Sequence, residues 1–256
     1  MVDMSLDKLG SGIDVIHAVP TGKREQPLPT IFFFHGYTSS KEVYSYFGYA
    51  LAQAGFRVIL PDAAMHGARY NGDEAQRLRY FWDILQANIE EFPDYVAEYR
   101  RRGLIDGEQI GVCGASLGGM SALGCMARYP WITAVAAFMG SGYFSTLSPA
   151  LFPPVSADRE ENQAVLQALA TKLADYDVST RLDALSNRPL LVWHGEADDV
   201  VPAAESVRLY QALQARDKLA NLTYLTEPGV GHRITPTALQ AGADFFQRTL
   251  SSRPER

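Results

Sequence analysis

Three residues that lie far apart in the sequence, Ser116, Asp198 and His232, have the side-chain types that nucleophilic catalysis requires. A serine hydroxyl is a weak nucleophile at neutral pH, so it needs a histidine base and a carboxylate that orients this base. Each of the three residues follows a run of apolar residues, which places it after a predicted buried strand. The three types therefore predict acyl transfer to and from a serine.

The segment GASLG, residues 114–118, places Ser116 between an apolar run and a helical pattern. A serine in such a turn is held at positive φ, which costs energy, and Gly114 and Gly118 leave the space that the turn needs. The pentapeptide is typical of the nucleophile elbow of α/β-hydrolases. By itself it is equally consistent with a glycine-rich turn that contains an incidental serine. The order Ser116, Asp198, His232 favours the elbow, because α/β-hydrolase triads have this order.

Three further segments resemble the branch of the α/β-hydrolases that includes the dienelactone hydrolases and the prolyl oligopeptidases. Residues 194–202 resemble its HGxxDxxVP segment, residues 34–37 its HG turn and residues 61–69 its PDxxxHG turn. The resemblance extends over residues 31–250 and implies a serine esterase. For the PDxxxHG turn we expect a structural role beneath the site.

The resemblance also implies roles for individual residues. The HGxxDxxVP pattern implies that Asp198 is the acid of the triad, with Asp199 and Glu196 as rivals. The oxyanion of acyl transfer needs backbone N–H donors. Leu117 supplies one as the residue after the nucleophile, and the resemblance implies that Tyr37 supplies the second. Dienelactone hydrolases have a cysteine in place of the nucleophilic serine, so their ring-opening substrate is not implied.

No cofactor and no metal site are predicted. His35 and His194 each precede a glycine after an apolar run, which could suggest a pair of metal ligands. Neither histidine has a ligand spacing such as H-E-x-x-H, and a serine triad needs no metal.

Alternating strand-like and helical segments predict an α/β protein with the α/β-hydrolase fold, a mostly parallel sheet with helices on both faces. The strand-like runs are residues 13–19, 30–34, 56–60, 109–113, 133–139, 190–193 and 222–225. The helical patterns are residues 41–54, 73–102, 116–129, 203–216 and 236–250. The first strand-like pieces lack a helical crossover, which predicts an antiparallel edge. Pro93 lies inside residues 73–102 and predicts a kink or a division into two helices there.

We expect residues 1–256 to form one domain with a lid-like insertion at about 141–188. The first half of this insertion, residues 143–154, is apolar and broken by prolines, which predicts neither a regular strand nor a helix. Residues 160–174 have the spacing of an amphipathic helix. Ligands of open α/β sheets bind beyond the carboxyl ends of the strands, where this insertion begins, so we interpret it as a lid.

The composition argues against several classes of partner. The net charge of −6 disfavours nucleic acid and anionic membranes. The longest apolar run, residues 134–139, is too short for a membrane span. The N-terminal residues lack the pattern of a secretory signal. Cys113 and Cys125 are expected to be buried, reduced thiols, which is typical of a cytoplasmic protein.

Together these features predict a carboxylesterase that acts on a small-molecule ester with a short to medium acyl chain. A peptidase or a thioesterase could use the same triad. The competing hypothesis from another class is a catalytically silent α/β-hydrolase scaffold that serves in binding.

Overall fold

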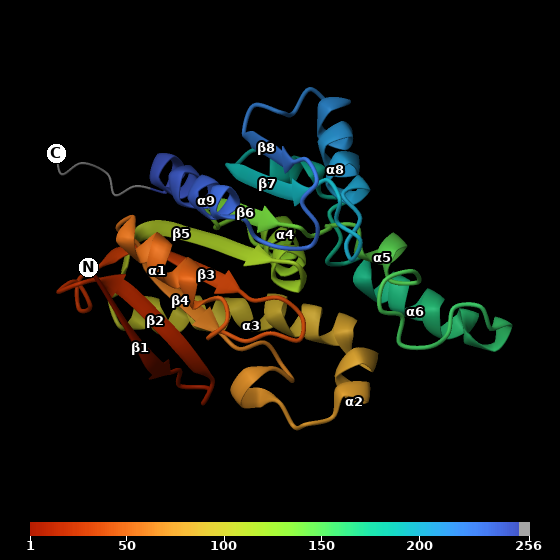
Figure 1. Ribbon diagram of the computed structural model, residues 1–256, viewed down its shortest axis with the longest axis horizontal. Coiled ribbons are helices and arrows are strands. Elements are labelled where there is room, and N and C mark those ends of the chain that lie inside the picture. Colours follow the sequence, from red (N-terminus) through yellow and green to blue (C-terminus); the bar gives the residue numbers. More distant parts are fainter. Residues whose placement is uncertain (251–256) are drawn as a thin grey trace.

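Within residues 1–250, which the computed structural model describes, the central sheet has eight strands in the order β1-β2-β4-β3-β5-β6-β7-β8 (Figure 1). β1 and β2 are antiparallel to their neighbours, and the strands from β4 to β8 are parallel. The predicted mostly parallel sheet with an antiparallel edge is therefore confirmed. The strands are β1 Val2–Lys8, β2 Asp14–Pro20, β3 Leu28–Phe34, β4 Arg57–Pro61, β5 Ile105–Ala115, β6 Ala134–Phe138, β7 Leu190–Gly195 and β8 Leu222–Glu227.

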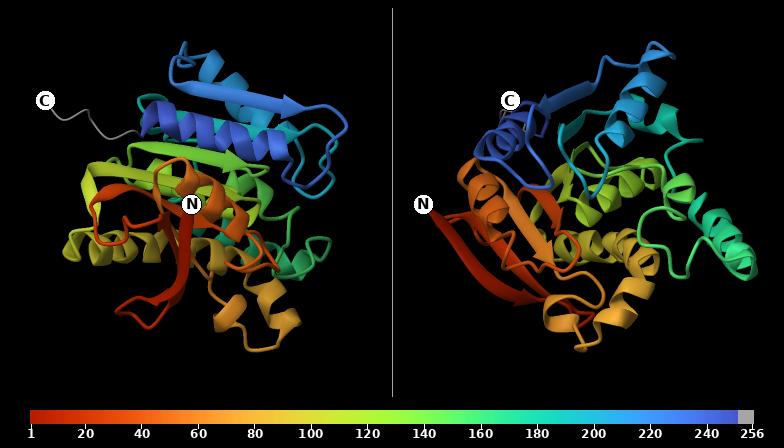
Figure 2. Two further views of the ribbon diagram at one scale, coloured as in Figure 1. Left: turned by 60° about the vertical axis from the view of Figure 1, so that its left-hand side comes forward. Right: turned by 45° about the vertical axis from the view of Figure 1, so that its right-hand side comes forward.

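Helices cover both faces of the sheet (Figure 2). Helices α1 and α9 pack on one face, and α3, α4 and α8 pack on the other. The helices are α1 Ser45–Gln53, α2 Glu74–Arg79, α3 Phe81–Arg101, α4 Leu117–Arg128, α5 Phe144–Leu147, α6 Gln163–Leu173, α7 Leu182–Ser186, α8 Ala204–Gln214 and α9 Pro236–Thr249, with short 3-10 turns at Gly67–Arg69 and Glu160–Asn162.

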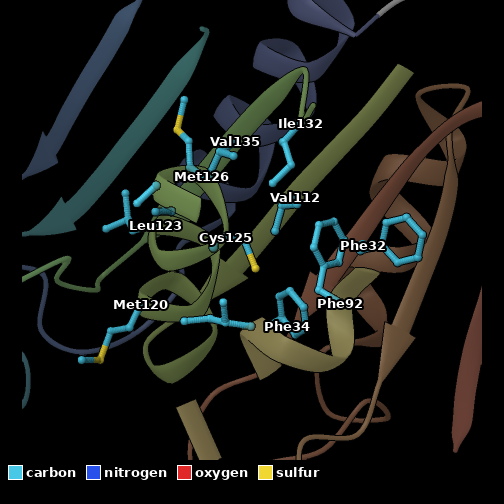
Figure 3. Close-up of a cluster of buried hydrophobic side chains, with 14 of the residues drawn as sticks. Phe32, Phe34, Phe92, Val112, Met120, Leu123, Cys125, Met126, Ile132 and Val135 are labelled. Atoms are coloured by element: carbon cyan, nitrogen blue, oxygen red, sulfur yellow. The ribbon is translucent and has the colours of Figure 1, made fainter. Parts of the chain in front are cut away.

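Strand β3 is buried along its whole length, because helices cover both of its faces. On one face Phe32 and Phe34 contact Phe92 of α3, with ring centroids 5.3 and 6.1 Å apart (Figure 3). On the other face Phe33 stacks on Phe47 of α1 at 4.5 Å. This two-sided packing fixes the carboxyl end of β3, from which the turn toward the candidate site leaves the sheet.

The predicted division of the long helical segment at Pro93 is wrong. Helix α3 runs from Phe81 to Arg101 through Pro93, and the boundary between α2 and α3 lies at Tyr80. An interior proline costs about 3 kcal/mol or more. The buried face of α3, which includes Phe92 and Val96 beside the proline, packs into the core and offsets this cost.

Residues 141–188 connect β6 to β7 and contain three helices, α5, α6 and α7. Helix α6, Gln163–Leu173, confirms the predicted amphipathic helix. The prediction that residues 143–154 contain no helix is wrong for Phe144–Leu147, which form the single turn α5. Its Phe144 is fully buried against Trp82 of α3, so tertiary packing orders a turn that the sequence pattern does not indicate.

Cys113 and Cys125 are free and buried, and burial raises the pKa of both thiols well above its usual value. None of the helices in residues 1–250 is both long and apolar enough to span a membrane.

Candidate active site

Ser116 lies between β5 and α4 with φ 56° and ψ −119°, the strained backbone that the sequence predicts. The turn is possible because two glycines flank it. A Cβ atom at Gly114 would overlap the backbone of Gly118, and a Cβ atom at Gly118 would overlap the carbonyl of Phe34. The Ser116 amide donates to the Phe138 carbonyl at 2.9 Å, which ties the turn to β6. The side chain of Ser116 is therefore presented at the carboxyl ends of the strands.

Two loops bring His232 and Asp198 to Ser116. His232 Nε2 lies 2.8 Å from Ser116 Oγ, and His232 Nδ1 lies 2.7 Å from Asp198 Oδ2. Thr235 caps α9 by accepting from the Ala238 amide at 3.0 Å, so the histidine loop ends at a fixed point. With Nδ1–H donating to the carboxylate, Nε2 is free to accept the serine proton. The geometry suits a serine that is activated by a histidine base.

Asp198 is held as a carboxylate by four polar contacts. Oδ1 accepts from the amides of Val200 and Val201 at 2.9 and 3.0 Å. Oδ2 contacts His232, and it also lies 3.2 Å from Nε2 of the fully buried His194. Burial favours the neutral acid, but the hydrogen bonds from His194 and His232 hold the pKa of Asp198 well below its usual range.

The two rivals of Asp198 do not face His232. Asp199 and Glu196 are exposed, whereas Asp198 is only 9% exposed. Glu196 accepts a hydrogen bond from the Thr226 hydroxyl at 2.8 Å. Of the three acidic residues of this loop, Asp198 is therefore the one that the structure brings to the histidine.

The predicted oxyanion donors lie on either side of the nucleophile. Leu117 is the first residue of α4, where helical N–H groups have no partner within the helix. Tyr37 follows Gly36, and a Cβ atom at Gly36 would lie 3.6 Å from the Cβ of Ser116. The turn after β3, residues 35–41, is thus in van der Waals reach of the serine. We call it the oxyanion turn, because it contains Tyr37, the predicted second donor.

Two neutral histidines hold this turn in place. His66 Nε2 accepts from the Thr38 amide at 3.0 Å, while its Nδ1 lies 2.8 Å from the Ala64 carbonyl. Burial lowers the pKa of His66 to about 4, so the acceptor nitrogen stays unprotonated at neutral pH. His35 makes the same kind of contact in the opposite direction. It belongs to the turn after β3, and its Nε2 accepts from the Ala63 amide of the segment after β4 at 3.0 Å.

A buried ion pair anchors the far end of the same turn. Lys41 Nζ lies 2.5 Å from Asp62 Oδ2, and the Lys41 amide donates to Asp62 Oδ1 at 3.0 Å. Burial opposes the charge of Lys41, but its hydrogen bonds to Asp62 and Glu42 raise its pKa. The turn after β3 is therefore joined at three points to the segment after β4.

Three supporting residues contact the candidate site or its turns, and the sequence analysis assigns no such contact to His194 or Lys41. His194 contacts the acid, His66 holds the oxyanion turn, and Lys41 pairs with Asp62. The PDxxxHG resemblance signals a structural role for Asp62 and His66, in agreement with their contacts. For Lys41 no sequence signal exists, since a lysine after Ser-Ser is ordinarily a surface residue.

The insertion between β6 and β7 contacts the start of α3. Trp82 Nε1 donates to the Leu151 carbonyl at 3.1 Å. Phe152, at φ 48°, packs on Phe81 and Tyr37 with ring centroids 4.6 and 5.3 Å away. An aromatic cluster from three separate segments thus adjoins the residue that carries one oxyanion donor.

Comparison with known proteins identifies relatives of the whole chain. Residues 44–253 match the prolyl oligopeptidase family. The chain is 49% identical to esterase YjfP of Escherichia coli (strain K12) over 240 residues, which are 93% of this chain and 96% of that protein. Among solved structures, TT1662 of Thermus thermophilus is 26% identical, with a TM-score of 0.76 over 99% of this chain and 100% of that chain. An acylaminoacyl peptidase of Pyrococcus horikoshii has a TM-score of 0.73 at 17% identity, and 42% of its chain is covered.

Proposed function

Because the chain belongs to the prolyl oligopeptidase family, we propose that it is a serine carboxylesterase in which Ser116, His232 and Asp198 form the triad. The observation that carries this proposal is the unbroken series of hydrogen bonds from Ser116 Oγ through His232 to Asp198, with distances of 2.8 and 2.7 Å. This arrangement supports the acyl-transfer mechanism.

The proposed reaction has two steps. Ser116 Oγ attacks the ester carbonyl carbon while His232 Nε2 takes the hydroxyl proton, and the amides of Tyr37 and Leu117 donate to the oxyanion. His232 then gives the proton to the departing alcohol, which leaves an acyl-serine. Water attacks the acyl-serine with His232 again as base, and the acid product leaves as Ser116 regains its proton. Asp198 stabilises the imidazolium in both steps.

An ester is a better candidate substrate than a peptide. The esterase from Escherichia coli matches this chain over nearly the full length of both proteins, whereas only 42% of the acylaminoacyl peptidase is matched. We propose that residues 141–188 act as a lid within a single domain. We further propose that the substrate has a short to medium acyl chain, since the insertion that we interpret as a lid is apolar in its first half.

The test compares the wild-type protein with Ser116→Ala on p-nitrophenyl butyrate. We expect kcat/KM of the variant to fall by about four orders of magnitude or more, because the nucleophile is lost while the binding surface stays. Wild-type protein should also react with a fluorophosphonate probe, and the variant should not. Substantial turnover by Ser116→Ala in a preparation free of other esterases would refute the assignment.

The same assays separate the alternatives. A silent scaffold would leave Ser116 unlabelled by the probe. A peptidase would cleave a matched p-nitroanilide at a measurable rate that is lost in Ser116→Ala, whereas an esterase would leave the anilide essentially intact. We expect labelling, together with a strong preference for the ester.

A further inference from the structure

Arg77 of α2 is a buried cation with no carboxylate within hydrogen-bonding distance among residues 1–250. It is 8% exposed, and its Nε is fully buried without a hydrogen-bond partner among residues 1–250. Its closest carboxylate contact within those residues is Glu74, 3.8 Å from Nη2, which is beyond hydrogen-bonding distance. Glu74 is itself 84% exposed, so this pair is screened by solvent.

Such a group is costly for the folded protein. Buried charges in proteins are ordinarily paired and hydrogen-bonded, because the loss of hydration is otherwise not offset. The Lys41–Asp62 pair nearby shows the usual solution, with a full ion pair at 2.5 Å. Arg77 instead has Glu74 and the Tyr37 hydroxyl as polar neighbours, and its Nε keeps a donor without an acceptor among the described residues.

The position of Arg77 relates it to the active site. Its guanidinium carbon lies 4.3 Å from the centroid of the Tyr70 ring and 5.6 Å from that of the Tyr37 ring. Burial raises the pKa of the Tyr37 hydroxyl, and the adjacent Arg77 charge opposes this shift. Tyr37 also carries the candidate oxyanion amide next to Ser116. Tyr37 is therefore in contact with Arg77 through its ring and belongs to the turn that lies next to Ser116.

We propose that Arg77 is an anion subsite that binds a carboxylate at the far end of the substrate, so that the enzyme prefers esters with a negatively charged terminus. This inference rests on the proposed esterase function and names its substrate class. A planar guanidinium matches the two oxygens of a carboxylate. Arg77 carries one positive charge, and the carboxylate of Glu74 lies nearby. This site therefore suits a ligand with one negative charge better than a phosphate dianion, which Glu74 would repel more strongly.

The competing explanation is a purely structural one, in which Arg77 only stacks on the Tyr70 ring. Cation–π stacking would stabilise the segment between β4 and α2 without any preference for charged substrates. Loss of Arg77 would then change the hydrolysis of neutral and anionic esters by the same factor. The ratio of the two activities therefore distinguishes the hypotheses.

The experiment uses the full chain and matched pairs of p-nitrophenyl esters. One member of each pair is the mono-p-nitrophenyl ester of glutarate, adipate or pimelate, which keeps a free carboxylate. The other member is the same ester with this carboxylate capped as a methyl ester, and the Ser116→Ala protein gives the background rate. We expect wild-type protein to favour the anionic member at one chain length by about tenfold or more in kcat/KM. Arg77→Gln should abolish this ratio, and Arg77→Lys, which keeps the charge, should retain part of it.

Glu74→Gln is the control within the same helix. It removes the nearby carboxylate and should keep or increase the preference for the anionic ester. The proposal is overturned if the wild-type ratio does not exceed one at any length, or if Arg77→Gln leaves the ratio unchanged. Neither result affects the esterase assignment, which would instead fail if the neutral esters were not hydrolysed above the Ser116→Ala background.

Discussion

At the scale of single residues, the adjacent aspartates 198 and 199 provide a matched pair for testing the acid of the triad. We predict that Asp198→Asn lowers kcat by about ten-thousandfold, because an amide at this position no longer favours the histidine tautomer that can accept the serine proton. Asp199→Asn removes the exposed carboxylate of the next residue and should change kcat little. Steady-state kinetics with p-nitrophenyl butyrate measure both effects.

The pair also controls for charge and for folding. Both variants remove one negative charge from the same loop, so a difference between them reflects geometry and not net charge. A comparable loss in Asp199→Asn, or a fully active Asp198→Asn, would contradict the assignment. Thermal unfolding of the two proteins shows whether either change also disturbs the loop.

The same loop shows how far single residues can be predicted from the sequence. The HGxxDxxVP resemblance selects Asp198 over its neighbours, and the structure brings that residue to His232. The resemblance does not indicate that His194 Nε2 lies 3.2 Å from the carboxylate oxygen of Asp198 that contacts His232. That contact depends on how β7 and the following loop fold back on each other, which residue types alone do not specify.

At the scale of elements, the oxyanion turn depends on a histidine from another loop. We predict that His66→Phe lowers kcat and kcat/KM together by about tenfold or more, since the Thr38 amide loses its acceptor and the neighbouring Tyr37 amide is no longer fixed for the transition state. KM should change little, because the Tyr37 amide is proposed to bind the oxyanion of the transition state and not the ground-state ester. The measurement is the separate determination of kcat and KM.

His66→Gln provides the control for this prediction. Its side-chain oxygen can still accept from the Thr38 amide, so we expect it to recover a large part of the activity that His66→Phe loses. Equal activities of the two variants would show that the acceptor has no role. A raised KM with an unchanged kcat in His66→Phe would indicate a role in substrate binding instead.

Elements also differ in how well periodicity predicts them. The strands, α4, α8 and α9 follow from hydrophobic patterns and from caps such as Thr235. Helix α3 passes through Pro93, and α5 forms in a proline-rich stretch, because burial against the rest of the core outweighs local preference in both places. Local pattern therefore predicts elements well only where packing agrees with it.

At the scale of the whole molecule, a buried histidine near the antiparallel edge makes stability depend on pH. His17 of β2 is 2% exposed, and its Nε2 accepts from Nε of the fully buried Arg57 at 2.9 Å. Burial lowers the pKa of His17 to about 3. The positive charges of Arg57, Arg24 and Arg102 also lower it, whereas the negative charge of Asp7 raises it. The folded protein therefore holds this ring neutral.

The sign of the effect follows from proton binding. In the unfolded chain a histidine has a pKa of about 6.5, so below this pH the unfolded state binds a proton that the folded state does not. We predict that the free energy of unfolding falls as the pH is lowered from about 6.5 toward 3. His17 should contribute a slope of about 1 kcal/mol per pH unit.

Denaturant unfolding of wild-type protein and His17→Gln at several pH values in this window measures that contribution. The other titrating groups, including His66, are present in both proteins and cancel in the difference. The glutamine variant should be less stable at neutral pH, with a shallower decline toward acid. Parallel pH dependences of the two proteins would show that His17 does not resist protonation in the fold.

The sequence by itself determined the α/β-hydrolase fold and the membership of the family, because the elbow at residues 114–118, the chain order of the catalytic types and the alternation of strands and helices are local features. Only the tertiary structure decided the contact of His194 with Asp198, the pairing of Lys41 with Asp62 and the burial of Arg77, whose Nε has no acceptor among residues 1–250. Each of these depends on how side chains from different segments are placed relative to one another. Such distances are set when the core packs, and residue order does not encode them in any local pattern.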